Sequence, residues 1–196
     1  MAPARCPRPQ LGGVHRGGVT LALGLALLGC PAPDLWPDSD PEPEPELLAA
    51  ADGWTRVVEP SEDWFADQRP DDAVCDDLGW FVDPISQTLE IETEVCDYPT
   101  LRQETLVALA PGDRISVAGF HDALTAPEPS QGYVGLALAG EIVWEYTVEI
   151  PADANLFDGS IVVDREVPAG TELQLHVHNH GPNTWQWTDV LARAQE

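Results

Sequence analysis

The stretch "TLEIETEV", residues 88–95, alternates apolar and polar side chains with a period of two. On an extended strand, Leu89, Ile91 and Val95 share one face. The opposite face carries Glu90, Glu92 and Glu94. Such alternation is typical of a strand with one buried and one solvated face, so it predicts an antiparallel sheet packed on a core.

Further short strands with turn signals between them are predicted along the chain. The stretches 114–120 and 160–167 have β character, and "YVGLALAG" (133–140) should form a hairpin with "EIVWEYTVEI" (141–150). The segment 100–110 fits a strand or a short helix, and we predict a strand. Roughly seven or eight short antiparallel strands indicate a mainly β fold, namely an antiparallel β-sandwich, of which a jelly roll is one form.

The net charge of the chain is strongly negative. There are 34 acidic and 9 basic residues, which give a net charge of −25, and every basic residue is an arginine. Such a surface repels nucleic-acid backbones and anionic headgroups, so we expect no nucleic-acid partner. Cations and neutral ligands remain compatible with it.

The N-terminal segment combines arginines with an apolar run at 19–29 that ends in "LLGC" at Cys30. The run is too short to span a bilayer as a mature helix. The combination resembles the lipobox signal peptide of bacterial lipoproteins. That resemblance implies a signal peptide at 1–29, lipidation of Cys30, and an exported domain anchored in the bacterial cell envelope on the non-cytoplasmic side.

Prolines alternate with acidic residues directly after Cys30. The segment 30–46 cannot form a core, and it predicts a semi-rigid tether with a rise of about 3 Å per residue. The folded β-sandwich domain should therefore comprise residues 47–196. Removal of the signal peptide takes away three arginines and no acidic residue, which lowers the net charge from −25 to −28.

Two cysteines, Cys75 and Cys96, lie in the predicted domain. Of the other two, Cys6 falls in the signal peptide and Cys30 at the lipidation site. Because an exported domain matures in an oxidising compartment, we predict a Cys75–Cys96 disulfide. In the chain-entropy model such a bridge stabilises the fold by about 3 kcal/mol.

A second alternating stretch, "LQLHVHNHGPNTW" at 173–185, carries three histidines two residues apart. We predict that it pairs as a hairpin with "TWQWTDV" (184–190) through the loop 181–183. In that register Trp185 and Trp187 face the core, because the opposite register would bury threonine and glutamine against leucines. The histidines would then face outward or line a shallow groove.

Two kinds of metal site are compatible with the sequence. His176 and His178 could bind zinc together with a third ligand, for which His121 is the remaining histidine of the domain. Oxygen ligands for calcium occur around Cys75, at Asp71, Asp72, Asp76 and Asp77. A polar strand face and aspartate-rich turns explain the same residues without a metal, and we favour that alternative.

No nucleophile elbow or phosphate-binding loop occurs in the sequence. We therefore expect a lipid-anchored, non-enzymatic binding protein with a carbohydrate or peptide ligand, for which Trp54, Trp64 and Trp80 are candidate stacking residues. One alternative is a metal-dependent enzyme that uses His176 and His178 to activate water. Another is a structural envelope protein without a small ligand.

Overall fold

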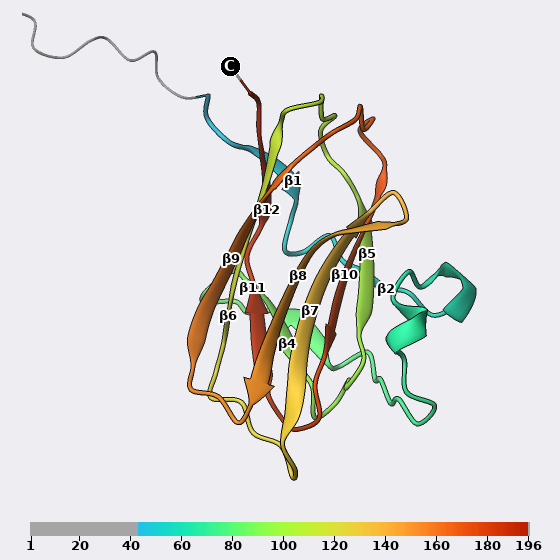
Figure 1. Ribbon diagram of the computed structural model, residues 1–196, viewed down its shortest axis with the longest axis vertical. Helices are drawn as coiled ribbons and strands as arrows, with labels where there is room; N and C mark the ends of the chain where they lie inside the picture. The colour runs from blue at the N-terminus through green and yellow to red at the C-terminus, as the bar shows by residue number, and fades with distance from the viewer. Residues whose placement is uncertain (1–42, 196) are drawn as a thin grey trace, which may run out of the picture. The chain divides into compact units, whose positions relative to one another are not determined.

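The computed structural model describes residues 43–195 (Figure 1). The predicted signal peptide, the lipidation site at Cys30 and most of the tether lie outside these residues. The described part confirms a β-sandwich of two antiparallel sheets. Within it, no helix has both the length and the apolar character needed to cross a bilayer.

One sheet has seven strands and the other has five. The seven-stranded sheet consists, in spatial order, of β1 (Glu46–Ala49), β12 (Val190–Arg193), β6 (Arg114–His121), β11 (Thr184–Trp187), β4 (Leu89–Glu92) and β3 (Trp80–Val82), with β9 (Asn155–Val162) also paired to β6. The five-stranded sheet consists of β2 (Thr55–Arg56), β5 (Thr100–Glu104), β10 (Glu172–His178), β7 (Ser130–Leu138) and β8 (Glu141–Ile150).

The predicted hairpin between β7 and β8 is confirmed. Its register runs from Ser130 opposite Ile150 to Leu138 opposite Glu141. Ala139 and Gly140 form the turn with φ angles of 52° and 87°. Positive φ at both central positions is typical of the tight turns that match strand twist. The strand predicted within 100–110 is also present, as β5.

The core lies between the two sheets, and both C-terminal tryptophans belong to it. Trp185 is 1% exposed and Trp187 is 2% exposed, as predicted. The expectation that Val95 shares the buried face of Leu89 and Ile91 is wrong. The strand β4 ends at Glu92, and the chain then turns, which leaves Val95 exposed.

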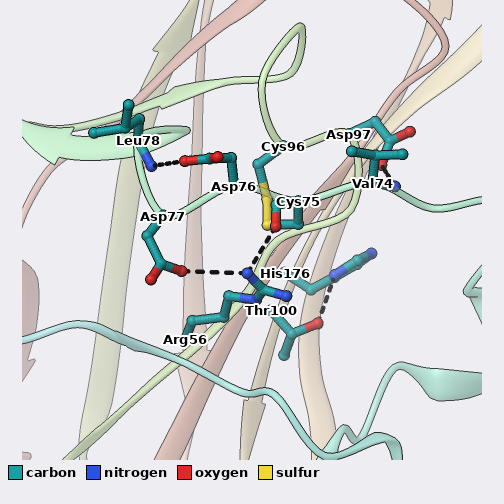
Figure 2. The surroundings of a disulfide bond; sticks show 10 residues. All are labelled: Arg56, Val74, Cys75, Asp76, Asp77, Leu78, Cys96, Asp97, Thr100 and His176. Atoms are coloured by element: carbon teal, nitrogen blue, oxygen red, sulfur yellow. Dashed lines mark hydrogen bonds and ion pairs between the residues drawn. A yellow bond between two sulfur atoms is a disulfide. The ribbon is translucent and has the colours of Figure 1, made fainter.

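The predicted disulfide between Cys75 and Cys96 is present, with a sequence separation of 21 (Figure 2). Cys96 is fully buried. The guanidinium of Arg56 donates to the carbonyl oxygen of Cys75 at 2.8 Å and to the Asp77 carboxylate at 3.2 Å. These contacts connect the disulfide loop to strand β2.

The predicted hairpin between the histidine strand and the tryptophan strand is wrong. β10 lies between β5 and β7 in the five-stranded sheet. β11 lies between β4 and β6 in the other sheet. The segment 179–183 therefore crosses from one sheet to the other. Alternation shows which residues share a face of a strand, but it does not show which strand is the neighbour.

Candidate ligand-binding site

The outer face of β10 is covered by the segment 57–70, which includes the short 3-10 helices η1 (Pro60–Glu62) and η2 (Ala66–Gln68). The fully buried side chain of Gln174 binds this segment. Its carbonyl oxygen accepts from the Trp64 N–H at 3.0 Å, and its amide donates to the Glu62 carbonyl at 2.7 Å. Both faces of β10 are therefore buried along most of its length.

His176 is fully buried beneath this segment, so the prediction that it faces outward is wrong. Its ring stacks on Phe65 with 4.9 Å between ring centroids. The ring centroid of Tyr98 lies 4.2 Å from that of His176. Gly135 provides the space for Phe65, since a Cβ atom there would lie 2.5 Å from the Phe65 ring. Alternation could not reveal this burial, because the covering residues lie over 100 positions earlier in the chain.

Hydrogen bonds connect His176 to the interior and to His178. The Thr100 hydroxyl lies 3.0 Å from Nδ1 of His176, a contact that Figure 2 shows. Nε2 of His176 lies 2.9 Å from Nδ1 of His178. Burial, and then the nearby His178, lowers the pKa of His176 well below its ordinary value. Burial, and then the nearby His180, lowers the pKa of His178 to about 4. Both imidazoles are therefore neutral at pH 7.

Two cavities adjoin at His178 and His180, at the end of β10. A cavity of about 590 Å³ is also lined by Pro127, Glu128, Pro129, Ser130 and Gln131. A second cavity of about 380 Å³ is also lined by Gln68, Pro70, Asp72, Thr93, Asp97, Asn179 and Gly181. We call the two together the histidine groove.

The histidine groove combines acidic and neutral hydrogen-bonding groups. Neither lysine nor arginine lines either of its cavities. Burial, and also the charge of Asp72, raises the pKa of Asp97, whose carboxylate accepts from the Val74 N–H at 2.9 Å. The groove therefore offers carboxylate acceptors, the neutral imidazole of His178 and the ring of His180, together with proline surfaces.

The structure brings together only two of the three histidines considered as zinc ligands. His121 lies on β6 in the other sheet and is fully buried. Its Nδ1 lies 2.9 Å from the Asp122 carbonyl, and its Nε2 lies 3.2 Å from the Tyr146 hydroxyl. Within residues 43–195, no three His, Cys, Asp or Glu side chains are grouped so that they could hold a metal ion.

The aspartates considered as calcium ligands have separate surroundings. Asp76 accepts from the Leu78 N–H at 2.9 Å, and Asp77 pairs with Arg56 (Figure 2). Asp71 is exposed, and Asp72 lines the histidine groove. Asp76 thus has the role of a turn residue that caps a local backbone N–H.

The tryptophans considered for ligand stacking do not line the groove. Trp54 is 7% exposed and belongs to the core. Trp80 is half-buried and packs against the core, and Trp64 packs with Phe65 on the covering segment. Sequence patterns missed the groove residues between Pro127 and Gln131, because they lie in and beside an irregular loop. The only sequence signal there is proline at alternate positions around Glu128.

The depressed pKa of His178 predicts a pH-dependent stability. The unfolded state binds a proton on this side chain near pH 6.5, whereas the folded state does so only near pH 4. Between these values the unfolded state binds more protons, so the free energy of unfolding falls as the pH falls. Urea denaturation at several pH values between 7 and 4.5 should show that the free energy of unfolding falls more steeply with pH for the wild type than for His178→Gln. Parallel curves for the two proteins would contradict the burial of a neutral imidazole.

No family model and no curated protein matches the chain. Among solved structures, a CBM4 structure is 16% identical, with 74% of this chain and 89% of that chain covered and a TM-score of 0.44. The mannan-recognising carbohydrate-binding module TmCBM27 is 10% identical (78% and 96% covered, TM-score 0.43). A putative sugar binding protein from Bacteroides thetaiotaomicron is 9% identical (76% and 100% covered, TM-score 0.43). At these scores the likeness carries no inference about function, and the sandwich assignment rests on the strand pairing itself.

Proposed function

We propose that this protein is an exported, lipid-anchored protein whose β-sandwich binds a neutral carbohydrate in the histidine groove. One observation carries the binding proposal: two adjoining cavities meet at His178 and His180, and hydrogen-bonding side chains line both of them. The anchor rests on the resemblance of residues 1–30 to a lipobox signal peptide. Neither part requires a metal cofactor.

The size and surface of the groove fit a sugar. Its cavities, of about 590 and 380 Å³, lie within the range of about 300–1,000 Å³ that is usual for small-molecule sites. A sugar presents hydroxyl groups that both donate and accept, next to flat C–H surfaces. The imidazoles and carboxylates can serve the hydroxyls, and Pro127, Pro129 and Pro70 offer apolar surface for the C–H groups.

The charge of the groove selects a neutral ligand over an anionic one. Asp72, Asp97 and Glu128 line it, and the net charge of the whole chain is −25. A uronate or phosphate group would meet this negative potential without a lysine or arginine from the cavity lining to pair with. Acidic polysaccharides should therefore bind more weakly than neutral ones.

Affinity electrophoresis tests the binding proposal with the full-length chain in native gels. Mannan, xylan and β-1,4-galactan serve as neutral probes, and polygalacturonate is the anionic control. We expect at least one neutral probe to retard the protein and polygalacturonate not to do so. His180→Ala should weaken the retardation about tenfold, which corresponds to about 1.4 kcal/mol, because this exposed side chain lines both cavities.

A matched variant separates the groove from the remaining surface. Asp158→Ala removes an exposed polar side chain on β9, which lines neither cavity. Its retardation should equal that of the wild type. Equal weakening in His180→Ala and Asp158→Ala, or the absence of retardation by all three neutral probes, would refute the proposal.

A further inference from the structure

Thr100, His176 and His178 form a chain of hydrogen bonds that leads from the interior to the histidine groove. The hydroxyl oxygen of Thr100 lies 3.0 Å from Nδ1 of His176. Nε2 of His176 lies 2.9 Å from Nδ1 of His178. Thr100 is 3% exposed and His176 is 0% exposed, so water cannot easily replace either contact. The remaining nitrogen of the chain, Nε2 of His178, is the one left for the groove.

The need to satisfy buried donors gives this chain a direction. A buried hydroxyl requires an acceptor for its hydrogen, and Nδ1 of His176 is the acceptor that the Thr100 hydroxyl contacts in the described structure. If Thr100 donates, Nδ1 of His176 is unprotonated and the proton of that neutral ring is on Nε2. This Nε2–H then donates to Nδ1 of His178, whose own proton must be on Nε2.

The reverse direction leaves a donor unsatisfied. It would place the His176 proton on Nδ1, facing the Thr100 hydroxyl and the nearby Pro99 carbonyl. The Thr100 hydrogen would then have no acceptor among the hydrogen bonds of residues 43–195, in which this hydroxyl contacts only Nδ1 of His176. A buried donor without an acceptor loses its hydrogen bond to water with no replacement, which disfavours this direction.

We infer that Thr100 and His176 are positioning residues that hold His178 as its Nε2–H tautomer, so that the histidine groove contains a fixed hydrogen-bond donor. Aromatic stacking fixes the plane of this ring. Tyr133 lies 5.1 Å from it between centroids at an interplanar angle of 18°, and Tyr98 lies 6.0 Å from it at 11°. Rotation of the ring would disrupt both stacks and the bond to His176.

The Nε2–H tautomer of His178 restricts the class of ligand that the histidine groove can bind. This step rests on the proposed function. The Nε2–H of His178 donates, and the Asp97 carboxylate, which lines the same 380 Å³ cavity, accepts. A sugar hydroxyl uses one group of each kind, because it both accepts and donates. A metal ion instead needs the lone pair of Nε2, which this tautomer does not offer. The groove should therefore prefer a hydroxyl-bearing ligand to a transition-metal ion.

Nitrogen-15 NMR of the histidine side chains tests the inference without any ligand. In the full-length, ¹⁵N-histidine-labelled protein at pH 7, long-range proton–nitrogen correlations should show protonated Nε2 and unprotonated Nδ1 for both His176 and His178. A proton on Nδ1 of either ring would overturn the assignment. This result is independent of polysaccharide binding, so the tautomer and the proposed function can fail separately.

A substitution tests whether Thr100 sets the tautomer. Thr100→Val keeps the shape of the side chain but removes the donor, and His176 and His178 should then show mixed tautomers. Thr105→Val is the matched control, because Thr105 is also buried at 3% exposure and its hydroxyl instead donates to the Pro168 carbonyl. An unchanged His178 spectrum in folded Thr100→Val would overturn the role of Thr100. If that variant does not fold, the wild-type spectrum alone decides the tautomer.

Discussion

Replacement of Trp187 by alanine is expected to lower the free energy of unfolding by about 3–5 kcal/mol. The side chain is 2% exposed and takes part in the aromatic contacts between the sheets. Its ring lies 5.7 Å from Trp144 on β8 and 5.9 Å from Phe157 on β9, measured between centroids. Rings held by two different sheets cannot collapse into the space without disturbing strand pairing, so a cavity should remain.

Urea denaturation followed by far-ultraviolet circular dichroism measures this loss. Phe81→Ala is the control, because Phe81 is a large aromatic residue in the same sheet that is 43% exposed on β3. Phe81→Ala should lower the free energy of unfolding clearly less than Trp187→Ala does. Since domains are typically stable by about 5–15 kcal/mol, the Trp187 variant should approach the limit of folding. A cost below about 1 kcal/mol would contradict the packing of this residue in the core.

Replacement of Cys30 by serine is expected to abolish membrane attachment completely. The thiol is the predicted site of lipidation, and serine cannot carry the same thioether-linked lipid. Multiple acyl chains anchor stably, whereas a protein without them has only its acidic surface, which anionic headgroups repel. Membrane fractionation and acyl labelling in a bacterial host provide the measurement.

Cys6→Ser is the matched control for this experiment, because Cys6 lies in the predicted signal peptide and should be absent from the mature protein. It should leave both the fractionation and the acyl label unchanged. Membrane retention of Cys30→Ser together with its acyl label would show that the lipobox assignment is wrong. Loss of label in both variants would also contradict it.

Local sequence patterns were sufficient to predict much of the fold. Alternation identified β4 and the burial of Trp185 and Trp187, and the turn at Gly140 identified the β7–β8 hairpin. The disulfide followed from the predicted export signal and the cysteine count. The strands and the turn depend on neighbouring residues, and the disulfide was predicted from the compartment that the lipobox resemblance implies.

The groove could not be predicted, because it depends on contacts between distant segments. The segment that carries Phe65 covers His176, which is more than 100 positions later in the chain, and no periodicity shows this. Crossing of residues 179–183 between the sheets places His180 beside the loop that contains Glu128. The sequence identified the histidine strand as unusual, but it gave the wrong neighbour for it and the wrong environment for His176.

Titration of the labelled full-length protein with neutral oligosaccharides, followed through the histidine side-chain resonances, tests the binding groove most directly. Mannotetraose, xylotetraose and β-1,4-galactotetraose are the probes. We predict that at least one of them shifts His178 and His180 with a common dissociation constant. His121 should stay unshifted, because it is fully buried on β6 and both of its ring nitrogens have hydrogen-bond partners. Unshifted His178 and His180 resonances with all three probes, or shifts of His121 equal to theirs, would contradict binding in the histidine groove.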